Sequence, residues 1–460
     1  MKADIYLKNG LIVTEENTFV GGVVVAGGKI SQLVAGDDET IEAAETIDLQ
    51  GKVVLPGLVD EHVHFNEPGR THWEGYRSGS MAAAAGGITT VIEMPLNAIP
   101  PSIDRAKLLY KREAVQHESV VDYAHWGGLV DNNLEALDGL QAEGVVGFKA
   151  FMSASGVDFE RVDDDVLYAG LLRSRDLGSV IGVHAENEYV TAMLGRQLRE
   201  AGRTDRAAWH ESRPPVTELE AINRAIYWAK AAQGNLHIVH VTLADGIRAA
   251  ARAKQEGVHV TVETCPHYLF FDQEDFVRIG PAAKCAPPLR SRSEVERLWK
   301  CVLDGLVDTI ASDHSPCTWA EKEPGMTNIW KAWGGISGVQ TMLPAILTEG
   351  VHKRGLPLSA LVRMMATNPA RIFGLYPQKG TILPGSDADL VVVDLDKEWS
   401  LTENDLFYKN KHSAFVGRSF KGAVERTIVR GVTVYQHGQI TAPPGFGQLL
   451  RRRHPYNYLP

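Results

Sequence analysis

Short apolar runs recur through the middle of the chain and alternate with helix-like stretches. Eight of these runs are candidates for strands: 58–63, 89–94, 120–126, 145–151, 180–184, 236–241, 258–264 and 308–311. Stretches such as 106–116 and 244–255, which lie between them, read as helices. Because the strand candidates are rich in Val, Ile and Leu throughout, they are typical of parallel strands buried on both faces. The pattern predicts an α/β fold, a (β/α)8 barrel of the TIM type, over residues 55–376.

An open doubly wound sheet is the main alternative for alternating strands and helices. Such sheets bind dinucleotides through a G-x-G-x-x-G turn after the first strand. No such turn follows residues 58–63. The sequence therefore favours the barrel.

Both ends of the chain show a different pattern, with short β-branched runs separated by tight turns. Asn9-Gly10 and Gly27-Gly28 separate such runs near the start of the chain, and similar β-branched runs occur at 388–394 and 423–431. Asn-Gly and Gly-Gly steps between β-branched runs predict hairpins. We therefore expect one small β-sandwich domain built from residues 1–54 and 377–440, followed by a C-terminal tail at 441–460.

Composition narrows the class of protein. A chain of 460 residues, 44% hydrophobic, can bury a large core and exceeds the usual size of one compact domain. Its net charge of −10 argues against a nucleic-acid partner, and we interpret the only dense basic run, Arg451 to Arg453, as a solvated tail. The four cysteines lack C-x-x-C spacing, the first residues lack an apolar signal core, and no apolar run is long enough to span a membrane. These features predict a cytoplasmic protein without a membrane partner.

Polar residues that can bind metals lie at the carboxyl ends of five predicted strands. In order along the chain they are His62, His64, Lys149, His184, His240 and Asp313. Carboxyl ends of barrel strands meet at one open face, so the six side chains are predicted to converge. The two histidines of His62-Val63-His64 share one face of a strand and can chelate one metal ion. His237 would face the other way from His240, and we interpret it as a packing histidine.

Lys149 is the member of this set that is not an ordinary metal ligand. Burial and neighbouring cations would both lower the pKa of its ammonium group. A neutral amine can react with CO₂ to form a carbamate, which is an anion with the ligand properties of a carboxylate. The alternative is that the side chain extends to the rim of the barrel and remains charged.

Four stretches of the sequence resemble the cyclic amidohydrolases of the amidohydrolase superfamily, and within them the allantoinase branch. They are 60–71, 86–97, 263–268 and 312–316, and the resemblance covers nearly the whole chain. It implies a binuclear centre in which His62, His64 and Asp313 bind one divalent ion and His184 and His240 bind the other. A carbamate on Lys149 and a hydroxide would bridge the ions. Zinc is the expected metal, with manganese, cobalt, nickel or iron as alternatives.

The resemblance also implies the reaction and the assembly. Asp313 would accept a proton from the attacking hydroxide and pass it to the leaving ring nitrogen. The reaction would open the hydantoin ring of allantoin to give allantoate in purine catabolism, and the partner would thus be a small cyclic ureide. Relatives are commonly homotetramers, which is the expectation for this chain.

Substrate choice rests on fewer positions. Dihydroorotases carry an arginine two residues after the H-x-H motif, where this chain has Asn66, and a substrate carboxylate would then lack its partner. Hydantoinases and dihydropyrimidinases usually place a tyrosine five residues after the modified lysine, where this chain has Ala154. The candidate substrate contacts are Asn97, Ser153, Ser155 and Ser315, each of which could instead be a turn or capping residue.

Two alternative functions remain open at this point. One is a hydantoinase or dihydropyrimidinase that acts on other cyclic ureides. The other is a non-catalytic scaffold on the same fold, although such scaffolds lack metal ligands and all six are present here. Residues 316–335, rich in Gly, Pro and Trp, are predicted to form a long loop that could act as a lid over the site.

Overall fold

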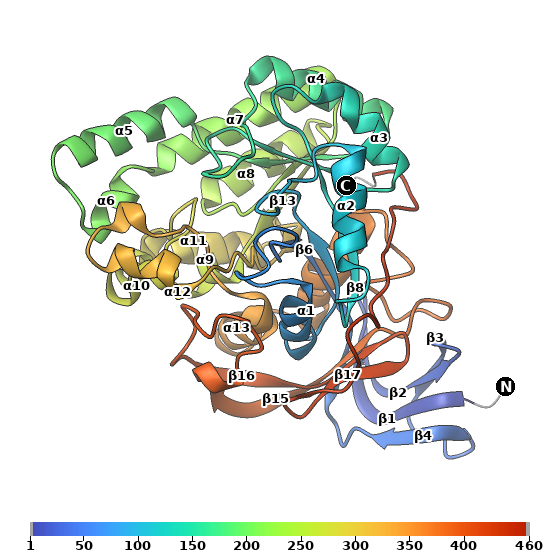
Figure 1. The fold of residues 1–460 in the computed structure, drawn as a ribbon. Coiled ribbons are helices and arrows are strands. Elements are labelled where there is room, and N and C mark those ends of the chain that lie inside the picture. The colour runs from blue at the N-terminus through green and yellow to red at the C-terminus, as the bar shows by residue number, and fades with distance from the viewer. Residues whose placement is uncertain (1–2, 457–460) are drawn as a thin grey trace.

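Parallel strands form the centre of the molecule in the computed structural model, which describes residues 3–456 (Figure 1). The central strands are β6 (Leu58–Val63), β7 (Ile88–Glu93), β8 (Asp122–His125), β9 (Gly127–Gly128), β10 (Phe148–Phe151), β11 (Ile181–His184), β12 (Leu236–Ile238), β13 (Val260–Thr264) and β14 (Thr309–Ile310). Each of the eight predicted runs contains or overlaps one of these strands. The apolar pattern therefore located the strands of the barrel to within a few residues.

The central strands close into a ring. Strands β6, β7 and β8 pair in parallel, and a second parallel sheet runs from β9 through β10, β11, β12 and β13 to β14. Only Trp126 separates β8 from β9, so these two form one interrupted strand that joins the sheets. On the other side, Val63 pairs with His314, and the backbone N–H of His64 donates to the carbonyl of His314 at 2.8 Å. These contacts join the segment after β14 to β6 and confirm the predicted eight-stranded barrel.

Helices surround this ring, most of them on its outside (Figure 1). They are α1 (Tyr76–Ala85), α2 (Arg105–Val115), α3 (Leu137–Ala142), α4 (Asp164–Asp176), α5 (Glu188–Glu200), α6 (Arg206–Glu211), α7 (Pro215–Ala232), α8 (Ala244–Gln255), α9 (Pro266–Phe270), α10 (Gln273–Ile279), α11 (Arg292–Leu303), α12 (Trp319–Lys322), α13 (Met342–Ile346), α14 (Leu358–Val362) and α15 (Asn368–Ile372). Side-chain caps begin several of them; Asp104, for example, accepts the backbone N–H of Lys107 at the start of α2. Both helices named from the sequence, at 106–116 and 244–255, are confirmed as α2 and α8.

Shorter helical turns fill the connections. The 3₁₀ turns are η1 (Leu134–Ala136), η2 (Pro281–Ala283), η3 (Glu323–Met326), η4 (Ile329–Lys331), η5 (Val339–Thr341) and η8 (Glu403–Asp405), and π turns occur at η6 (Leu347–His352) and η7 (Arg363–Thr367). Helices α5 and α6 project from one side of the barrel (Figure 1). Among the described residues, no helix combines the length and the apolar character needed to cross a membrane.

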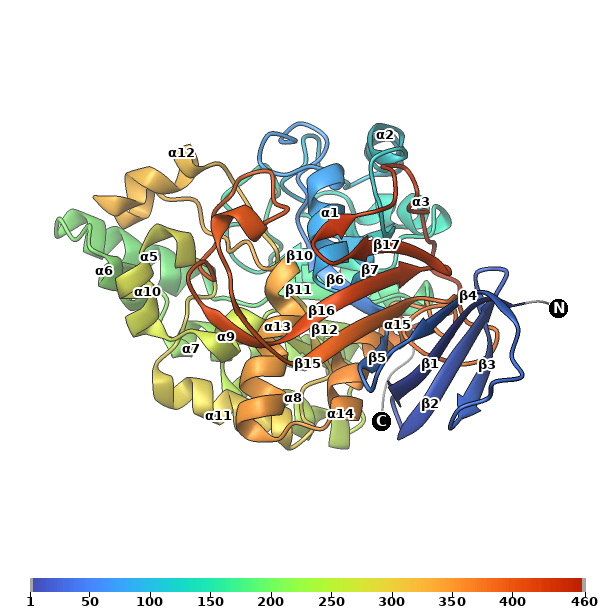
Figure 2. The same cartoon turned by 90° about the horizontal axis from the view of Figure 1, so that it is seen from below.

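Strands from both ends of the chain form one further sheet (Figure 2). The strands are β1 (Ala3–Val13), β2 (Thr18–Ala26), β3 (Lys29–Ala35), β4 (Ala43–Asp48), β5 (Val53–Pro56), β15 (Leu390–Ser400), β16 (Ser419–Val429), β17 (Val432–Gln436) and β18 (Gln439–Ile440). Antiparallel pairing of β5 with β15 joins the two ends of the chain. This terminal sheet, defined by these nine strands, confirms that both chain ends build one β-rich unit.

A buried ion cluster connects the terminal sheet to the floor of the barrel. The ammonium of Lys379 lies 2.6 Å from Asp122, 2.9 Å from Asp387 and 2.7 Å from Asp389. Asp122 begins β8, whereas Asp387 and Asp389 lie just before β15. Arg430, between β16 and β17, also pairs with Asp122. The cluster thus ties four separate segments of the chain together.

The C-terminal segment is only partly the solvated tail that the sequence predicts, because Arg451 and Arg453 are exposed whereas the backbone is docked on the barrel. Its backbone runs along the floor of the barrel, where the N–H of Leu450 donates to the carbonyl of Tyr123 at 2.7 Å and that of Tyr456 donates to Gly178 at 2.8 Å. The Arg452 guanidinium donates to the carbonyl of Val146, and its burial lowers the pKa to about 10. Within the basic run Arg452 departs from the prediction, because its guanidinium reaches a backbone carbonyl that the sequence does not reveal.

Candidate metal centre

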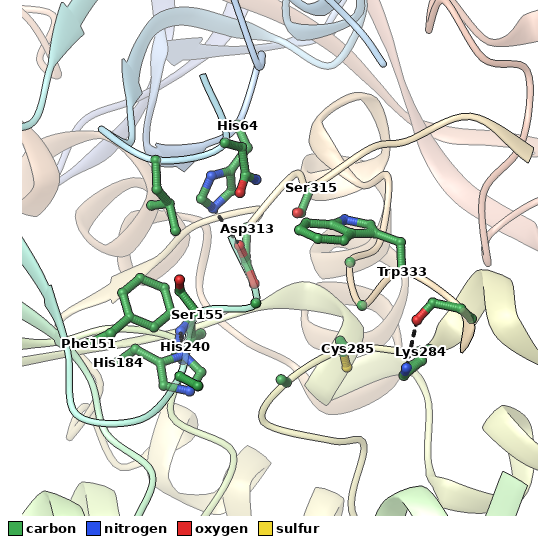
Figure 3. A pocket seen from close by; sticks show the side chains of 18 of the residues that line it. His64, Phe151, Ser155, His184, His240, Lys284, Cys285, Asp313, Ser315 and Trp333 are labelled. Carbon is green, nitrogen blue, oxygen red and sulfur yellow. Dashed lines mark hydrogen bonds and ion pairs between the residues drawn. The ribbon is translucent and has the colours of Figure 1, made fainter. Parts of the chain in front are cut away.

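The six side chains predicted to converge all line one cavity, of about 450 Å³, at the carboxyl ends of the barrel strands. Figure 3 shows His64, His184, His240 and Asp313 among them. His62 and His184 lie at the ends of β6 and β11, and Lys149 lies within β10. His64, His240 and Asp313 lie in the segments that directly follow β6, β12 and β14. The barrel therefore brings together residues that are up to 251 positions apart in the sequence.

Three of these residues form a first group around the carboxylate of Asp313. Its Oδ1 atom lies 3.3 Å from Nε2 of His62 and 3.4 Å from Nε2 of His64. One ligand atom from each residue lies within 4.8 Å of the others, a spacing that allows all three to bind one ion. Figure 3 shows His64 and Asp313 pointing toward one another.

His184 and His240 form a second group beside the first. Nδ1 of His184 lies 3.0 Å from Nε2 of His240. Two imidazole nitrogens at this separation can bind the same ion, because each zinc–nitrogen bond is about 2.0–2.1 Å long. The ring of His240 is also close to the first group, with its centroid 5.4 Å from that of His62.

Lys149 is completely buried, and its amine has no hydrogen-bond partner among the described residues. The amine lies 5.0 Å from the centroid of the Phe151 ring. Burial lowers the pKa of Lys149 to about 8, although the carboxylates of Glu263 and Asp313 act in the opposite direction. A buried amine without a partner costs free energy unless another group satisfies it. The unpartnered amine of Lys149 therefore fits a site in which a bound group satisfies it.

The charge states of the site suit metal binding. Burial lowers the pKa of His64 to about 4 and also lowers the pKa values of His184 and His240, so these imidazoles are neutral near pH 7. Burial alone would raise the pKa of Asp313, but His62 and His64 outweigh it and hold that pKa at about 2. Neutral imidazoles and an ionised carboxylate are the forms that bind divalent ions.

Two buried glutamates hold the histidine rings, and sequence reasoning did not assign either of them. Oε1 of Glu263 lies 2.8 Å from Nδ1 of His62, and Oε2 of Glu186 lies 2.8 Å from Nε2 of His184. Arg213 pairs with Glu186 and contributes to lowering the pKa of that carboxyl to about 2, against the effect of burial. The available signals were an acidic residue inside the apolar run 258–264 and another two positions after His184.

Three non-glycine residues that line the cavity, Asn97, His240 and Asp313, have a positive φ. His240 and Asp313 both have φ near +43°, in the left-handed region that side chains other than glycine rarely adopt. Such conformations cost free energy and persist where the surrounding structure fixes them. Here they follow directly after strands and turn the side chains into the cavity.

The four candidate substrate contacts do not all line the cavity. Asn97, Ser155 and Ser315 line the cavity, whereas the buried Ser153 is not among its lining residues. Ser155 also has a local role, because its hydroxyl donates to the carbonyl of Phe159 at 2.7 Å.

The two positions that bear on the choice of substrate, Asn66 and Ala154, also differ in location. Asn66 is buried away from the cavity and donates from its side chain to the carbonyl of Pro316 at 3.3 Å. Ala154, five residues after Lys149, lines the cavity. His237 does not line the cavity; its Nδ1 lies 2.8 Å from the hydroxyl oxygen of Thr261, consistent with a packing role. His237 forms, with Glu61 and Glu263, a second buried group of potential ligands beneath the first.

The segment 316–335 forms the outer wall of the cavity and contains three short helical turns, α12, η3 and η4. Two buried lysines hold its backbone. Lys284 donates to the carbonyls of Ile329 and Ala332, at 2.9 and 2.6 Å, and Lys322 donates to those of Trp333 and Gly335, at 2.9 and 2.5 Å. Trp330 and Trp333 line the cavity, as Figure 3 shows for Trp333, whereas Trp319 is 43% exposed and does not. The lid role stays a prediction.

Comparisons with known proteins identify similar chains of two kinds. The family described as "Amidohydrolase family" matches residues 53–434. The chain is 49% identical over 449 residues to an allantoinase of Rubrobacter xylanophilus, covering 97% of both chains, and 43% identical over 452 residues to an allantoinase of Escherichia coli strain K12, covering 97% and 98%. Among solved structures, an L-hydantoinase (dihydropyrimidinase) from Arthrobacter aurescens is similar with a TM-score of 0.95 and 40% identity, covering 98% of this chain and 100% of the other. A dihydropyrimidinase from Brevibacillus agri NCHU1002 gives a TM-score of 0.91 and 31% identity over 98% and 99%.

Proposed function

Because this chain belongs to the amidohydrolase family, we propose that it is a hydrolase that opens the hydantoin ring of allantoin to give allantoate in purine catabolism. The observation that supports hydrolysis is the convergence of four histidines, Lys149 and Asp313 on one cavity at the carboxyl ends of the strands. The choice of allantoin is supported by relatives named allantoinase that are 43–49% identical over nearly the full chain.

We propose that His62, His64 and Asp313 hold one divalent ion and that His184 and His240 hold a second. The unpartnered amine of Lys149 supports a carbamate at this position, which would lie between the two ions. Zinc is the proposed metal, although imidazole and carboxylate ligands also accept manganese, cobalt, nickel and iron. When bound, two such ions lower the pKa of water and polarise an amide carbonyl.

Asp313 is proposed to move the proton in this reaction. Its carboxylate would accept the proton of the attacking hydroxide as the new bond from oxygen to the ring carbon forms. The bond from that carbon to the ring nitrogen then breaks, and Asp313 returns the proton to the nitrogen. Nε2 of His62 and Nε2 of His64 both lie within 3.4 Å of Asp313 Oδ1, so an ion held by these three residues would also fix the position of the carboxylate.

Replacement of Asp313 by asparagine tests this role. We expect Asp313→Asn to lower kcat for allantoin by about 10²- to 10⁴-fold, the usual contribution of a general acid–base group, with at least one ion retained by the histidines. Asp304→Asn, at the partly exposed C-terminal end of α11, is a matched control and should retain wild-type turnover. If Asp313→Asn retains more than about a tenth of the wild-type kcat, the proposed role is wrong.

A second candidate function is the hydrolysis of simpler cyclic ureides, because the similar solved structures include hydantoinases and dihydropyrimidinases. Against it, Ala154 occupies the cavity position where those enzymes usually carry a tyrosine. Measuring kcat/KM for both allantoin enantiomers, hydantoin and dihydrouracil separates the two functions. Faster turnover of hydantoin or dihydrouracil than of either allantoin enantiomer would contradict the proposed substrate. A freshly purified protein with neither bound metal nor turnover would instead support a scaffold.

We further propose a cytoplasmic location and a homotetramer. The four cysteines, all buried and free, are compatible with a reducing compartment. Light scattering of the purified protein measures the number of subunits directly, and a mass other than four times 50.3 kDa would contradict the tetramer.

A further inference from the structure

A single buried carboxylate lies beneath both halves of the proposed metal centre. Glu263 belongs to β13 and is completely buried. Its Oε1 atom lies 2.8 Å from Nδ1 of His62 and also accepts the backbone N–H of His240 at 2.8 Å. His62 belongs to the first group of ligands and His240 to the second, so one oxygen atom contacts both.

These two hydrogen bonds fix different features of the site. The bond to Nδ1 of His62 orients the ring so that Nε2 points toward Asp313, 3.3 Å away. The bond to the backbone N–H of His240 holds a residue whose φ is near +43°. That backbone in turn places Nε2 of His240 3.0 Å from Nδ1 of His184. Without the carboxylate, both the His62 ring and the His240 backbone would lose their support.

We propose that Glu263 is a positioning residue that supports both metal ions at once, so that its removal weakens the two sites together. This inference rests on the proposed binuclear function. It follows from the general behaviour of carboxylates behind metal-binding histidines, whose loss typically costs 10- to 100-fold in metal affinity. What distinguishes Glu263 is that its support is shared between the two groups.

Glu186 provides a matched comparison within the same site. It is also completely buried, and among the proposed ligands in the described chain it contacts only His184, at 2.8 Å. Its other partner in the described part of the chain is Arg213, which is not a proposed ligand. Glu186 therefore supports the second group alone, and the same change of side chain can be made at both positions.

The experiment titrates the metal-free wild type, Glu263→Gln and Glu186→Gln with Zn²⁺ in competition with a chelator and counts the bound ions. Glutamine keeps the size of the side chain but removes the charge that strengthens both hydrogen bonds. We expect wild type to bind two ions, Glu263→Gln to bind both about 10- to 100-fold more weakly, and Glu186→Gln to weaken only one of them. If Glu263→Gln weakens one ion or neither, the inference is wrong.

A second variant keeps this test decisive. If Glu263→Gln does not fold, Glu263→Asp replaces it, since the shorter side chain keeps the charge but cannot reach both donors. We expect Glu263→Asp to weaken at least one ion, and two ions of wild-type affinity in this variant would overturn the inference. Failure of the wild type to bind two ions would instead contradict the proposed function, whereas intact binding in the variants of an active enzyme would contradict only the inference.

Discussion

Two buried lysines, which lie at opposite ends of the barrel strands, differ in their partners and in the direction of their pKa shifts. Lys379, at the floor, lies within 2.9 Å of three carboxylates. Lys149, in the cavity, has no hydrogen-bond partner. Burial lowers the pKa of both, but for Lys379 the carboxylates of Asp389, Asp122 and Asp387 outweigh that effect and raise its pKa above the ordinary value. For Lys149 burial prevails, and its pKa falls to about 8.

The cluster around Lys379 at the floor holds segments of the chain together, whereas the cavity around Lys149 is suited to binding ligands. A buried charge is tolerated when the protein supplies partners of opposite charge with good geometry. The floor meets this condition with its own residues, which come from four segments of the chain. The cavity leaves a buried amine unsatisfied, which disfavours the metal-free protein and favours whatever completes the site.

The largest expected effect comes from replacing Lys149. Lys149→Met should abolish measurable hydrolysis, a loss of at least about 10³-fold, because no carbamate can form between the proposed ions. The same change should stabilise the metal-free protein. The pKa of Lys149 falls from 10.5 to about 8, and at about 1.4 kcal/mol per unit its ammonium destabilises the fold by about 3 kcal/mol.

The sign of this stability effect depends on pH. Below pH 8 the lysine is charged in both the folded and the unfolded protein, so the full cost applies, and it disappears as the pH rises past the pKa of the unfolded chain. Urea denaturation at neutral pH in the presence of a chelator measures the change. A metal-free Lys149→Met protein that is less stable than wild type would contradict the comparison.

Lys379→Met should act in the opposite direction. Removing the ammonium takes away the cation that three buried carboxylates share. Asp122 and Asp387 keep Arg430 and Lys29 as partners, but the shared buried cation is lost, and we expect the free energy of unfolding to fall by about 3–5 kcal/mol. The turnover of the folded fraction should be unchanged, because Lys379 does not line the cavity. Urea denaturation with allantoin turnover measured in parallel tests both statements.

Lys29→Met is the control for this prediction. Lys29 also pairs with Asp387, but its side chain is 48% exposed, so we expect a loss below about 1 kcal/mol. Similar losses in the two variants would show that the buried cluster is no stronger than a surface ion pair.

The smallest expected effect is a pH dependence. Only a neutral amine reacts with CO₂, so carbamate formation on Lys149 in the metal-free protein should increase as the pH rises through about 8 at constant dissolved CO₂. Carbon-13 NMR with labelled bicarbonate detects the carbamate, and Lys149→Arg should lack the signal. A signal of constant size between about pH 6.5 and about pH 9 would contradict a titrating Lys149.

Much of the fold could be predicted from the sequence, because buried parallel strands leave continuous apolar runs. All eight runs coincide with barrel strands, and both β-rich ends pair in one sheet. The Lys379 cluster could not be predicted in this way, since Asp122 and Asp389 are far apart in the sequence and give no local signal. The docked C-terminal segment was missed for a similar reason, because its contacts are mainly backbone hydrogen bonds.

Some residues of the candidate site could likewise be predicted from the sequence and others could not. Residues at strand ends were assigned correctly to one cavity, because barrel geometry fixes where strand ends lie. Loop residues were harder, since the path of a loop decides which side chain reaches the cavity: Ser315 lines it and Ser153 does not. Glu263 and Glu186 were not found because their role depends on which atom each carboxylate faces.

The outer wall of the cavity has a consequence for how substrate range can change. Lys284 and Lys322 hold segment 329–335 through backbone carbonyls, which every amino acid provides. Side chains in this segment, such as Trp333, can therefore be exchanged without removing the hydrogen bonds that fix the wall. We expect substitutions of these side chains to change the shape of the cavity while the four hydrogen bonds that hold its wall remain.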